Sequence, residues 1–321
     1  MNDLVQTEVV NENYPLPLVI KPRAEAVDLT GWVGENEELL NELLLKQGGI
    51  LFRGFDDLNV DKFREFIDKV SGEALEYNER SSPRSQVSGN IYTSTEYPAD
   101  KEIPLHNENS YQKRFPAKIF FFCETPPGSG GETPLADCRR VLKRLGEPLV
   151  QEFRERQWML VRNFNRGFGL KWQNVFQSDD SQIVEDYCRN NDLDFCWEDR
   201  GVLQTRACRQ AVRRHPQTGE ETWFNHTAFF HASSIEPGMR RALSEVFDDY
   251  QLPSNTFWGD GEPFSDELID VIRGAYQDEI VKFAWQKNDL LMLDNLLVAH
   301  GRSSFAGERR ILVGMSDLIS A

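Results

Sequence analysis

The segment PLHNENSYQKRFP, residues 104–116, holds a histidine and a carboxylate two positions apart, His106 and Glu108. In a β-strand, residues i and i+2 point to the same side, so these side chains can offer one nitrogen and one oxygen to a single point. Two histidines and one carboxylate on one face of an octahedron leave three positions open, the arrangement of non-haem Fe(II) oxygenases. A His-x-Glu pair also occurs at ordinary protein surfaces. A third ligand is therefore needed to distinguish a metal site from a solvated pair.

The chain has only five histidines, and His300 is the best candidate for the third ligand. It ends the apolar stretch LLMLDNLLVAH and is followed by Gly301 and a turn. His215 lies in RHPQTGE, where Pro and Gly predict a turn. His231 follows two phenylalanines and is expected at a helix start or in the core.

Two further features favour an anionic ligand beside this metal site. The glycine-rich turn GSGGETP offers the hydroxyl of Thr133, and GERRILVGM offers Arg309 and Arg310. A guanidinium binds a carboxylate in a planar, bidentate way, and a hydroxyl adds a donor. Strand alternation groups Arg309 with Ile311, Val313 and Met315, so periodicity does not select Arg310.

In this order, HNE, GGET and DNLLVAHGRSSFAGERR resemble the taurine dioxygenase-like superfamily of Fe(II)- and 2-oxoglutarate-dependent oxygenases. The resemblance covers most of the chain. It is closest to the branch of the syringomycin-type aspartyl hydroxylase and clavaminate synthase, in which the metal carboxylate is a glutamate, as at Glu108. The presence of Glu108 argues against halogenation, because halogenases of this superfamily lack the metal carboxylate.

The resemblance implies that His106, Glu108 and His300 bind Fe(II), and that O2 and 2-oxoglutarate are co-substrates. It also implies Thr133 and Arg310 as binders of the distal carboxylate of 2-oxoglutarate, with the second arginine of the pair doing this work. The expected reaction is hydroxylation of an unactivated C–H bond of an amino acid or amino-acid-derived substrate in specialised metabolism, with release of succinate and CO2. The substrate is expected either free or attached to a carrier protein.

Candidate substrate-binding residues lie in three segments. TWFNHTAFF resembles a family segment that lines the substrate side, which makes Trp223, Asn225 and His226 candidates. His226 departs from the glutamine expected there in similar proteins, and a hydrogen-bonded bystander is the alternative to a role in specificity. Arg162, in LVRNFNRGFGLKWQNVF, is a candidate for binding a substrate carboxylate, although an arginine paired with the acidic surface is an equal alternative. Asn90 lies in the hydroxyl-rich segment SPRSQVSGNIYTSTEYP before the metal motif.

The elements that must position these residues predict an α+β fold. Apolar periodicity predicts helices over 36–47, 59–70, 137–156 (interrupted near Pro148) and 265–279 with Ser265 as N-cap. Short apolar runs predict buried strands within 48–55 and 117–123, and two or three more follow residue 288. With the resemblance, this favours a double-stranded β-helix (jelly-roll) core with flanking helices. A single domain, 1–321, is expected, with about 150–215 as an inserted lid.

The amino-acid composition disfavours some classes of binding partner. Asp and Glu number 52 against 36 Lys and Arg, a formal charge of −16, which disfavours nucleic acid and anionic membranes as partners. The sequence shows no signal peptide and no apolar stretch long enough to span a bilayer, and its five irregularly spaced cysteines predict reduced thiols in a cytoplasmic protein. The oligomeric state is left open.

Three alternatives to hydroxylation remain at this point. The same oxidant can give desaturation or oxidative cyclisation. From another class, the chain would be a non-catalytic metal-binding jelly-roll module, for which a 2-oxoglutarate anchor has no purpose. A hydrolytic zinc enzyme is less favoured, because the sequence has no HExxH helix.

Overall fold

The central sheet of the protein has eight strands in the order β1-β2-β3-β16-β7-β19-β5-β4. A computed structural model describes residues 3–11, 14–56, 58–76, 79, 85–94, 97–167 and 169–320. The strands are β1 Val5–Asn11, β2 Tyr14–Pro22, β3 Gly49–Phe52, β16 Leu290–Asp294, β7 Arg114–Thr125, β19 Arg310–Ser320, β5 Ile91–Thr93 and β4 Gln86–Ser88. Among the residues that the structure describes, β2 and β3 are the only strands of this sheet that pair in parallel. β7 and β19 form the longest pairing and hold the centre of the sheet.

A smaller sheet of three strands, in the order β6-β17-β9, lies beside the central sheet. Its strands are β6 Ile103–His106, β17 Val298–Arg302 and β9 Leu135–Asp137, and a short ribbon pairs β8 Ser129–Gly130 with β18 Phe305–Ala306. A buried cluster joins the two sheets, with Leu135 and Val298 from the smaller one and Phe121, Ile311 and Val313 from the larger one. The two sheets therefore share one core, and the metal motifs belong to the smaller sheet.

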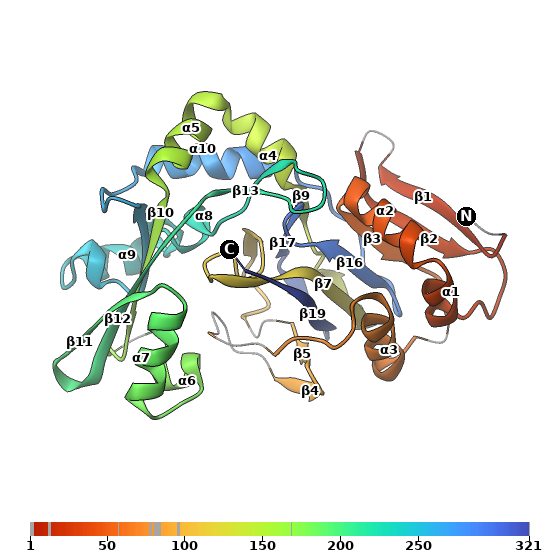
Figure 1. Cartoon of the computed structure of the whole chain (residues 1–321), viewed down its shortest axis with the longest axis horizontal. Helices are drawn as coiled ribbons and strands as arrows, with labels where there is room; N and C mark the ends of the chain where they lie inside the picture. The colour runs from red at the N-terminus through yellow and green to blue at the C-terminus, as the bar shows by residue number, and fades with distance from the viewer. Residues whose placement is uncertain are drawn as a thin grey trace.

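Three helices cover the other face of the central sheet (Figure 1). They are α1 Leu29–Glu35, α2 Glu37–Gln47 and α3 Val60–Ser71. The α3 stripe predicted from sequence, Phe63, Phe66, Ile67 and Val70, is buried against β7 and β19 residues such as Phe122 and Leu312. Asn59 caps α3, because its side chain accepts a hydrogen bond from the backbone N–H of Lys62.

A second, separate sheet lies at the left of Figure 1, next to α6 and α7, opposite β1–β3. Its order is β11-β12-β10-β15, with β10 Trp158–Phe164, β11 Asp194–Glu198, β12 Val202–Arg209 and β15 Ser254–Trp258. Helices α6 Trp172–Phe176 and α7 Ser181–Asn190 accompany it. Three of its strands lie within the expected insertion at 150–215, but the edge strand β15 comes from well beyond that boundary.

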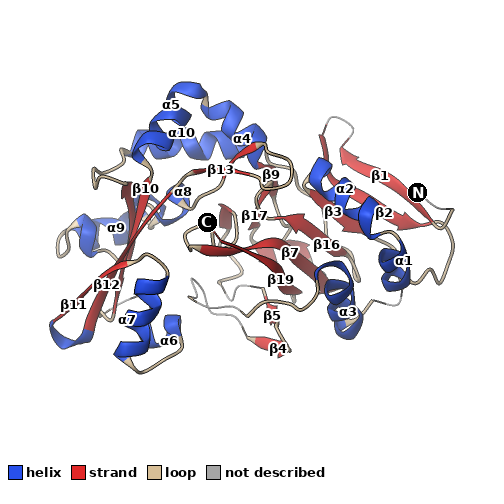
Figure 2. Cartoon of the chain, in the orientation of Figure 1, coloured by secondary structure: helices blue, strands red, loops and turns tan. Residues whose placement is uncertain are grey.

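Figure 2 distinguishes helices from strands among the remaining elements. They are helices α4 Cys138–Leu145, α5 Glu147–Arg156, α8 Thr227–Phe230, α9 Pro237–Ser244 and α10 Asp266–Gln277, the hairpin β13 Val212–Arg214 and β14 Glu221–Trp223, and 3-10 turns at Asp199–Gly201, Ala232–Ser234 and Asp249–Gln251. Within the described part of the chain, no helix has the length and apolarity that crossing a membrane requires.

Most predicted elements are confirmed, including Ser265 as the N-cap of α10. The helix expected over 137–156 is two helices, because Gly146 takes a positive φ of 79° two residues before Pro148. The C-terminal part contains four strands, β16 to β19, rather than two or three, since the two-residue β18 was not separated from its neighbouring turn.

Candidate active site

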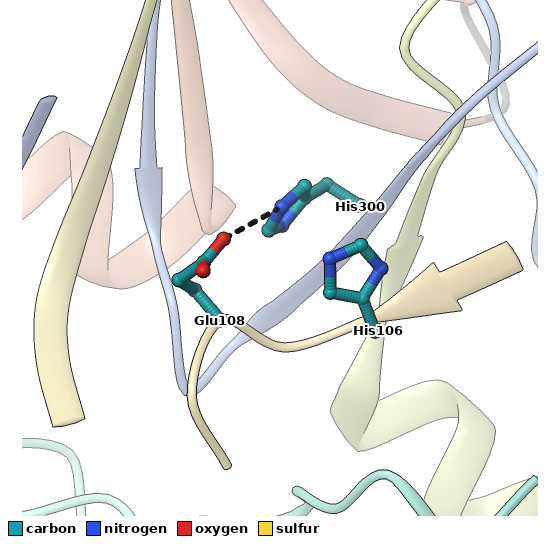
Figure 3. A group of neighbouring side chains, drawn as sticks. All are labelled: His106, Glu108 and His300. Atoms are coloured by element: carbon teal, nitrogen blue, oxygen red, sulfur yellow. Dashed lines mark ion pairs between the residues drawn. The ribbon is translucent and has the colours of Figure 1, made fainter. Parts of the chain in front are cut away.

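His106, Glu108 and His300 come together at one point of the smaller sheet (Figure 3). His106 and His300 are direct partners across the antiparallel pair β6 and β17. One ligand atom from each of the three residues lies within 4.8 Å of the others, and Nε2 of His300 is 3.7 Å from Oε2 of Glu108. This is the one cluster of metal-binding side chains among the residues that the structure describes.

The donor set fits a divalent transition metal. Two imidazoles and one carboxylate suit iron, and metal–ligand bonds of about 2.1 Å allow donor atoms to lie 3 to 4 Å apart around one ion. Glu108 and His300 are 2% and 4% exposed, and Nδ1 of His300 has no hydrogen-bond partner among the described residues. A separation of 3.7 Å is too long for a hydrogen bond, so the arrangement of Glu108 and His300 suits a shared ion better than a direct contact.

Glu108 is positioned differently from the expectation that it continues the strand of His106. Strand β6 ends at His106, and residues 108–110 form a turn. The turn is fixed by Asn295, whose Oδ1 accepts from the backbone N–H of Glu108 at 2.7 Å and whose Nδ2 donates to the carbonyl of Glu108 at 2.9 Å. Nδ2 of Asn295 also donates to the Pro116 carbonyl at 2.8 Å. The ligand loop is thus held by the buried carboxamide of Asn295, and the buried Asn107 adds a hydrogen bond to the Asn295 carbonyl at 2.7 Å.

A second layer holds Asn295 itself. Asp294 accepts from the backbone N–H groups of Leu296 and Leu297 and lies 3.0 Å from Nε2 of buried His215. His215 is in the expected turn, but it also connects the β13–β14 hairpin to the turn before β17. Sequence reasoning missed Asp294 and Asn295, although both stand in the quoted motif DNLLVAH directly before the third ligand.

Gly301 allows the two histidine-bearing strands to approach. A Cβ at this position would lie 2.6 Å from the backbone oxygen of Ile103, closer than real Cβ contacts. Any side chain at 301 would therefore push β6 away from β17 and separate His106 from His300. A glycine is therefore needed next to His300 so that β6 and β17 can pack closely.

A small cavity of about 40 Å³ opens beside the two histidines. Its wall includes Ser94, His106, Phe121, Thr133, His300 and Arg309. Thr133 is buried, and its Oγ1 accepts a hydrogen bond from the indole N–H of Trp285 at 3.1 Å. The hydroxyl expected from the glycine-rich turn is therefore next to the metal cluster, oriented by a tryptophan that sequence reasoning did not single out.

Arg309 lines this cavity, whereas Arg310, the arginine that the resemblance implies as the co-substrate anchor, is not in its wall. Ile311, Val313 and Met315 pack in the core between the sheets, and alternation directs Arg309 to the same side. Arg310 points away, is 48% exposed and forms an ion pair with Glu124 at 2.6 Å. Arg309 directly precedes β19, and the two adjacent arginines lie on opposite sides of the chain, as strand alternation predicts.

Arg309 is a half-buried cation whose described partners are neutral. Its Nε donates to the carbonyl of Gly131 at 3.0 Å, and its Nη1 donates to the hydroxyl of Ser94 at 3.3 Å. No carboxylate of the described residues lies within ion-pair distance of it. Burial, followed by the nearby Arg302 guanidinium, lowers the pKa of Arg309 to about 10. The cavity therefore carries positive charge that an anion would balance.

His226 lies beside His106, and the centroids of the two rings are 5.4 Å apart. It is buried, stacks on Phe230 and is hydrogen bonded through Nδ1 to the hydroxyl of Ser110 at 2.5 Å. Burial, then the neighbouring His106, holds the pKa of His226 well below its ordinary value. Phe229 contacts both His106 and His226. His226 is thus beside the metal cluster, as expected for a substrate-side residue.

Arg162 is not on the protein surface but in a buried ion pair. It is 5% exposed, and its Nη1 lies 3.6 Å from Oε1 of Glu79. The guanidinium also lies over the rings of Phe164 and Tyr111. The hydroxyl of Tyr187 donates to Glu79 at 2.8 Å, and burial raises the pKa of this carboxyl. Glu79 therefore links the segment before β4 to Arg162 of β10 and to Tyr187 of α7.

The two candidate asparagines are occupied by backbone contacts. Nδ2 of Asn225 donates to the Ala211 carbonyl, and its Oδ1 accepts from the backbone N–H of Thr227. Nδ2 of Asn90 donates to the Ala74 carbonyl at 2.6 Å, in the turn between β4 and β5. Neither lines the cavity beside the histidines. In the hydroxyl-rich segment around Asn90, residues 82–84, 95 and 96 lie outside the described part of the chain.

Comparisons with known proteins agree with this geometry. The taurine catabolism dioxygenase TauD, TfdA family matches residues 12–316. The dapdiamide synthesis protein DdaC of Enterobacter agglomerans is 41% identical over 278 residues, which are 87% of this chain and 84% of DdaC. A clavaminate synthase-like protein of Arabidopsis thaliana is 27% identical over 97% of this chain and 98% of its own length.

Solved structures show the same fold. PvcB of Pseudomonas aeruginosa has a TM-score of 0.58 at 17% identity, covering 98% of this chain and 92% of PvcB. A taurine dioxygenase of Burkholderia xenovorans has a TM-score of 0.54 at 14% identity, covering 98% of this chain and 89% of its own. With the His-Glu-His cluster and the family match over nearly the whole chain, the protein belongs to the TauD/TfdA dioxygenase family and is an oxygenase that uses iron and 2-oxoglutarate.

Proposed function

We propose that the protein hydroxylates an unactivated C–H bond of an amino acid or amino-acid-derived substrate, free or bound to a carrier protein, in specialised metabolism. The substrate, O2 and 2-oxoglutarate would give the hydroxylated product, succinate and CO2. The names of two similar proteins, dapdiamide synthesis protein and clavaminate synthase-like protein, support a biosynthetic substrate. The paired sheets support a double-stranded β-helix core.

In this proposal His106, Glu108 and His300 hold the iron. Bound there, iron would supply the oxidising chemistry that couples decarboxylation of 2-oxoglutarate to oxidation of the substrate. The burial of Glu108 and His300 limits access of water from their side, and the Asn295 clamp keeps the Glu108 carboxylate directed at the shared point.

The observation that carries the proposal is Arg309. A half-buried guanidinium with a carbonyl and a hydroxyl as its partners, in the same cavity as His106 and His300, suits a ligand that brings its own carboxylate. We propose that Arg309 and Thr133 bind the distal carboxylate of 2-oxoglutarate, in place of the pair Thr133 and Arg310. Ser94 would add a hydroxyl to the same site.

On the substrate side we propose His226 and Phe229 as the wall nearest the iron, because both rings lie close to His106. Arg162 has Glu79 as a counter-ion, so its proposed role is to hold the second sheet over this wall as a lid. Asn90 and Asn225 are left out of the proposed site, since their amides hold backbone groups.

The test is anaerobic titration of the apo-protein with Fe(II) and 2-oxoglutarate, followed by visible absorption. A weak charge-transfer band is expected for the wild type and should be lost in His106→Ala. Iron binding without such a band would reject the 2-oxoglutarate site. With the band established, oxygen-dependent succinate release would find substrates, and product mass would separate hydroxylation from desaturation or cyclisation, the alternative outcomes of the same chemistry.

A further inference from the structure

A larger cavity, of about 340 Å³, adjoins the proposed 2-oxoglutarate pocket. It lies among β6, α8 and α10, and its wall includes Leu105, Phe229 and Tyr276. Ile103 and Arg302 line both cavities. Phe229 also contacts the ring of His106. The large cavity is therefore next to both the pocket and the metal cluster, and it shares Phe229 with the proposed substrate wall.

The charged residues of this cavity are mainly positive. Arg273, Lys282 and Arg302 line it against a single carboxylate, Glu102, in a chain whose formal charge is −16. No ion pair joins Glu102 to any of the three cations among the described residues. A locally positive wall on a strongly acidic protein is the reverse of what the overall composition predicts.

The three cations differ in how they are held. Arg302 is 5% exposed and donates to the carbonyls of Tyr97, Pro98 and Lys101, so its charge is fixed without a carboxylate partner in the described chain. Arg273 donates to Asp270 at 3.0 Å and to Ser234 at 2.8 Å, which offsets part of its charge.

Lys282 is exposed and forms no ion pair with a described residue. Its position is nevertheless fixed, because the preceding Val281 exchanges two backbone hydrogen bonds with Leu135, two residues beyond Thr133. Lys282 thus presents a lysine charge at the cavity wall, close in the fold to the turn that supplies the proposed co-substrate hydroxyl.

An acidic protein that takes a dianionic co-substrate has an electrostatic problem. Its overall field repels 2-oxoglutarate at long range, and only a local positive region restores a favourable approach. The product succinate is also a dicarboxylate and must leave by a route that does not trap it. A cavity with one buried and two more accessible cations, sharing its inner wall with the binding pocket, fits both requirements.

Resting on the proposed function, we propose that this cavity is the port for dicarboxylates, through which 2-oxoglutarate enters and succinate leaves. Lys282 is the outer cation that attracts the dianion, and Arg302 is the inner one at the wall shared with the pocket. This role concerns the approach of the co-substrate. The bound state is assigned to Thr133 and Arg309.

The test is the rate at which 2-oxoglutarate associates with the anaerobic Fe(II) enzyme, followed by stopped-flow absorption of the charge-transfer band. Lys282→Glu is compared with Lys287→Glu, an exposed lysine outside the cavity wall that carries the same change of charge. Lys282→Glu should lower the association rate constant about tenfold at low salt and about threefold at physiological ionic strength, with dissociation unchanged. Lys282→Gln should give about half of this effect on a logarithmic scale.

An equal decrease of the association rate constant in Lys282→Glu and Lys287→Glu would overturn the proposed port, because it would reflect only the overall charge of the protein. Unchanged association in both variants would overturn it as well. Should association stay normal while the KM of a later-identified anionic substrate rises in Lys282→Glu alone, the cavity would serve that substrate instead. Absence of the band in the wild type would reject the proposed function itself, a result distinct from a normal band with charge-independent rates.

Discussion

The iron and co-substrate side of the candidate site is built on paired strands, whereas its substrate side is built on a turn and on the second sheet. His106 and His300 are paired across β6 and β17, whose register fixes their directions, and Arg309 directly precedes β19. His226 is at the start of the four-residue helix α8, and Arg162 comes from β10. The iron and co-substrate side depends on strand geometry. The substrate side depends on how side chains of the second sheet and of α8 pack beside it.

This difference predicts that the two sides of the site would tolerate substitution differently. A strand register places several residues at once, so the chemistry of the first side is set by the fold that the family shares. On the second side, single side chains such as His226 and Phe229 make the wall beside His106. Members of one family can therefore retain one cofactor chemistry while the substrate wall varies.

The largest expected effect separates the adjacent arginines. Arg309→Ala should raise the KM for 2-oxoglutarate about 100-fold or more, because it removes charge-assisted hydrogen bonds worth about 3 kcal/mol in total. Arg310→Ala is the matched control and should change this KM less than about twofold, since it loses only an exposed ion pair with Glu124. Steady-state succinate release at varied 2-oxoglutarate measures both. The reverse order would restore Arg310 as the anchor.

The second prediction concerns the clamp on the carboxylate ligand. Asn295→Ala removes three hydrogen bonds, two of them to the backbone of Glu108, and should lower affinity for the metal about 10- to 100-fold. Anaerobic titration with Co(II), followed by its d–d absorption, measures this without turnover. Since the variant should also lose about 2–4 kcal/mol of stability, thermal unfolding must show that it is folded at the titration temperature. Unchanged Co(II) affinity in a folded variant would reduce Asn295 to a structural residue.

The sequence predicted strand-borne features better than contacts between distant segments. The helices and strands with clear periodicity were confirmed, and residue types and order sufficed to bring His106, Glu108 and His300 together as candidates. Alternation alone would also have selected Arg309, but the family pattern was preferred to it. The proposed site follows local periodicity in taking Arg309, the arginine that lines the cavity.

Contacts between segments far apart in sequence had no comparable signal. Glu79 pairs with Arg162 across 83 positions of the chain, and Asn295 holds a turn 187 positions away. A single sequence does not show which distant residue a glutamate or an asparagine will bind. The Ala211 and Ala74 carbonyls that Asn225 and Asn90 bind are likewise visible only in the fold, which is why the proposed site omits both residues. Polar residues near a motif are as often its scaffold as its binding surface.

The smallest expected effect tests this last distinction on the substrate side. Asn225→Ala loses the hydrogen bonds to Ala211 and Thr227, so it should lower the free energy of unfolding by about 1–2 kcal/mol. Co(II) affinity and the 2-oxoglutarate charge-transfer band should be unchanged. Asn295→Ala also removes a buried carboxamide, but that variant should lower Co(II) affinity. Denaturant unfolding and the two titrations measure these quantities in the same samples. A variant with normal stability and a normal band, but with impaired substrate turnover, would instead make Asn225 a substrate contact and move the boundary between the two sides of the site.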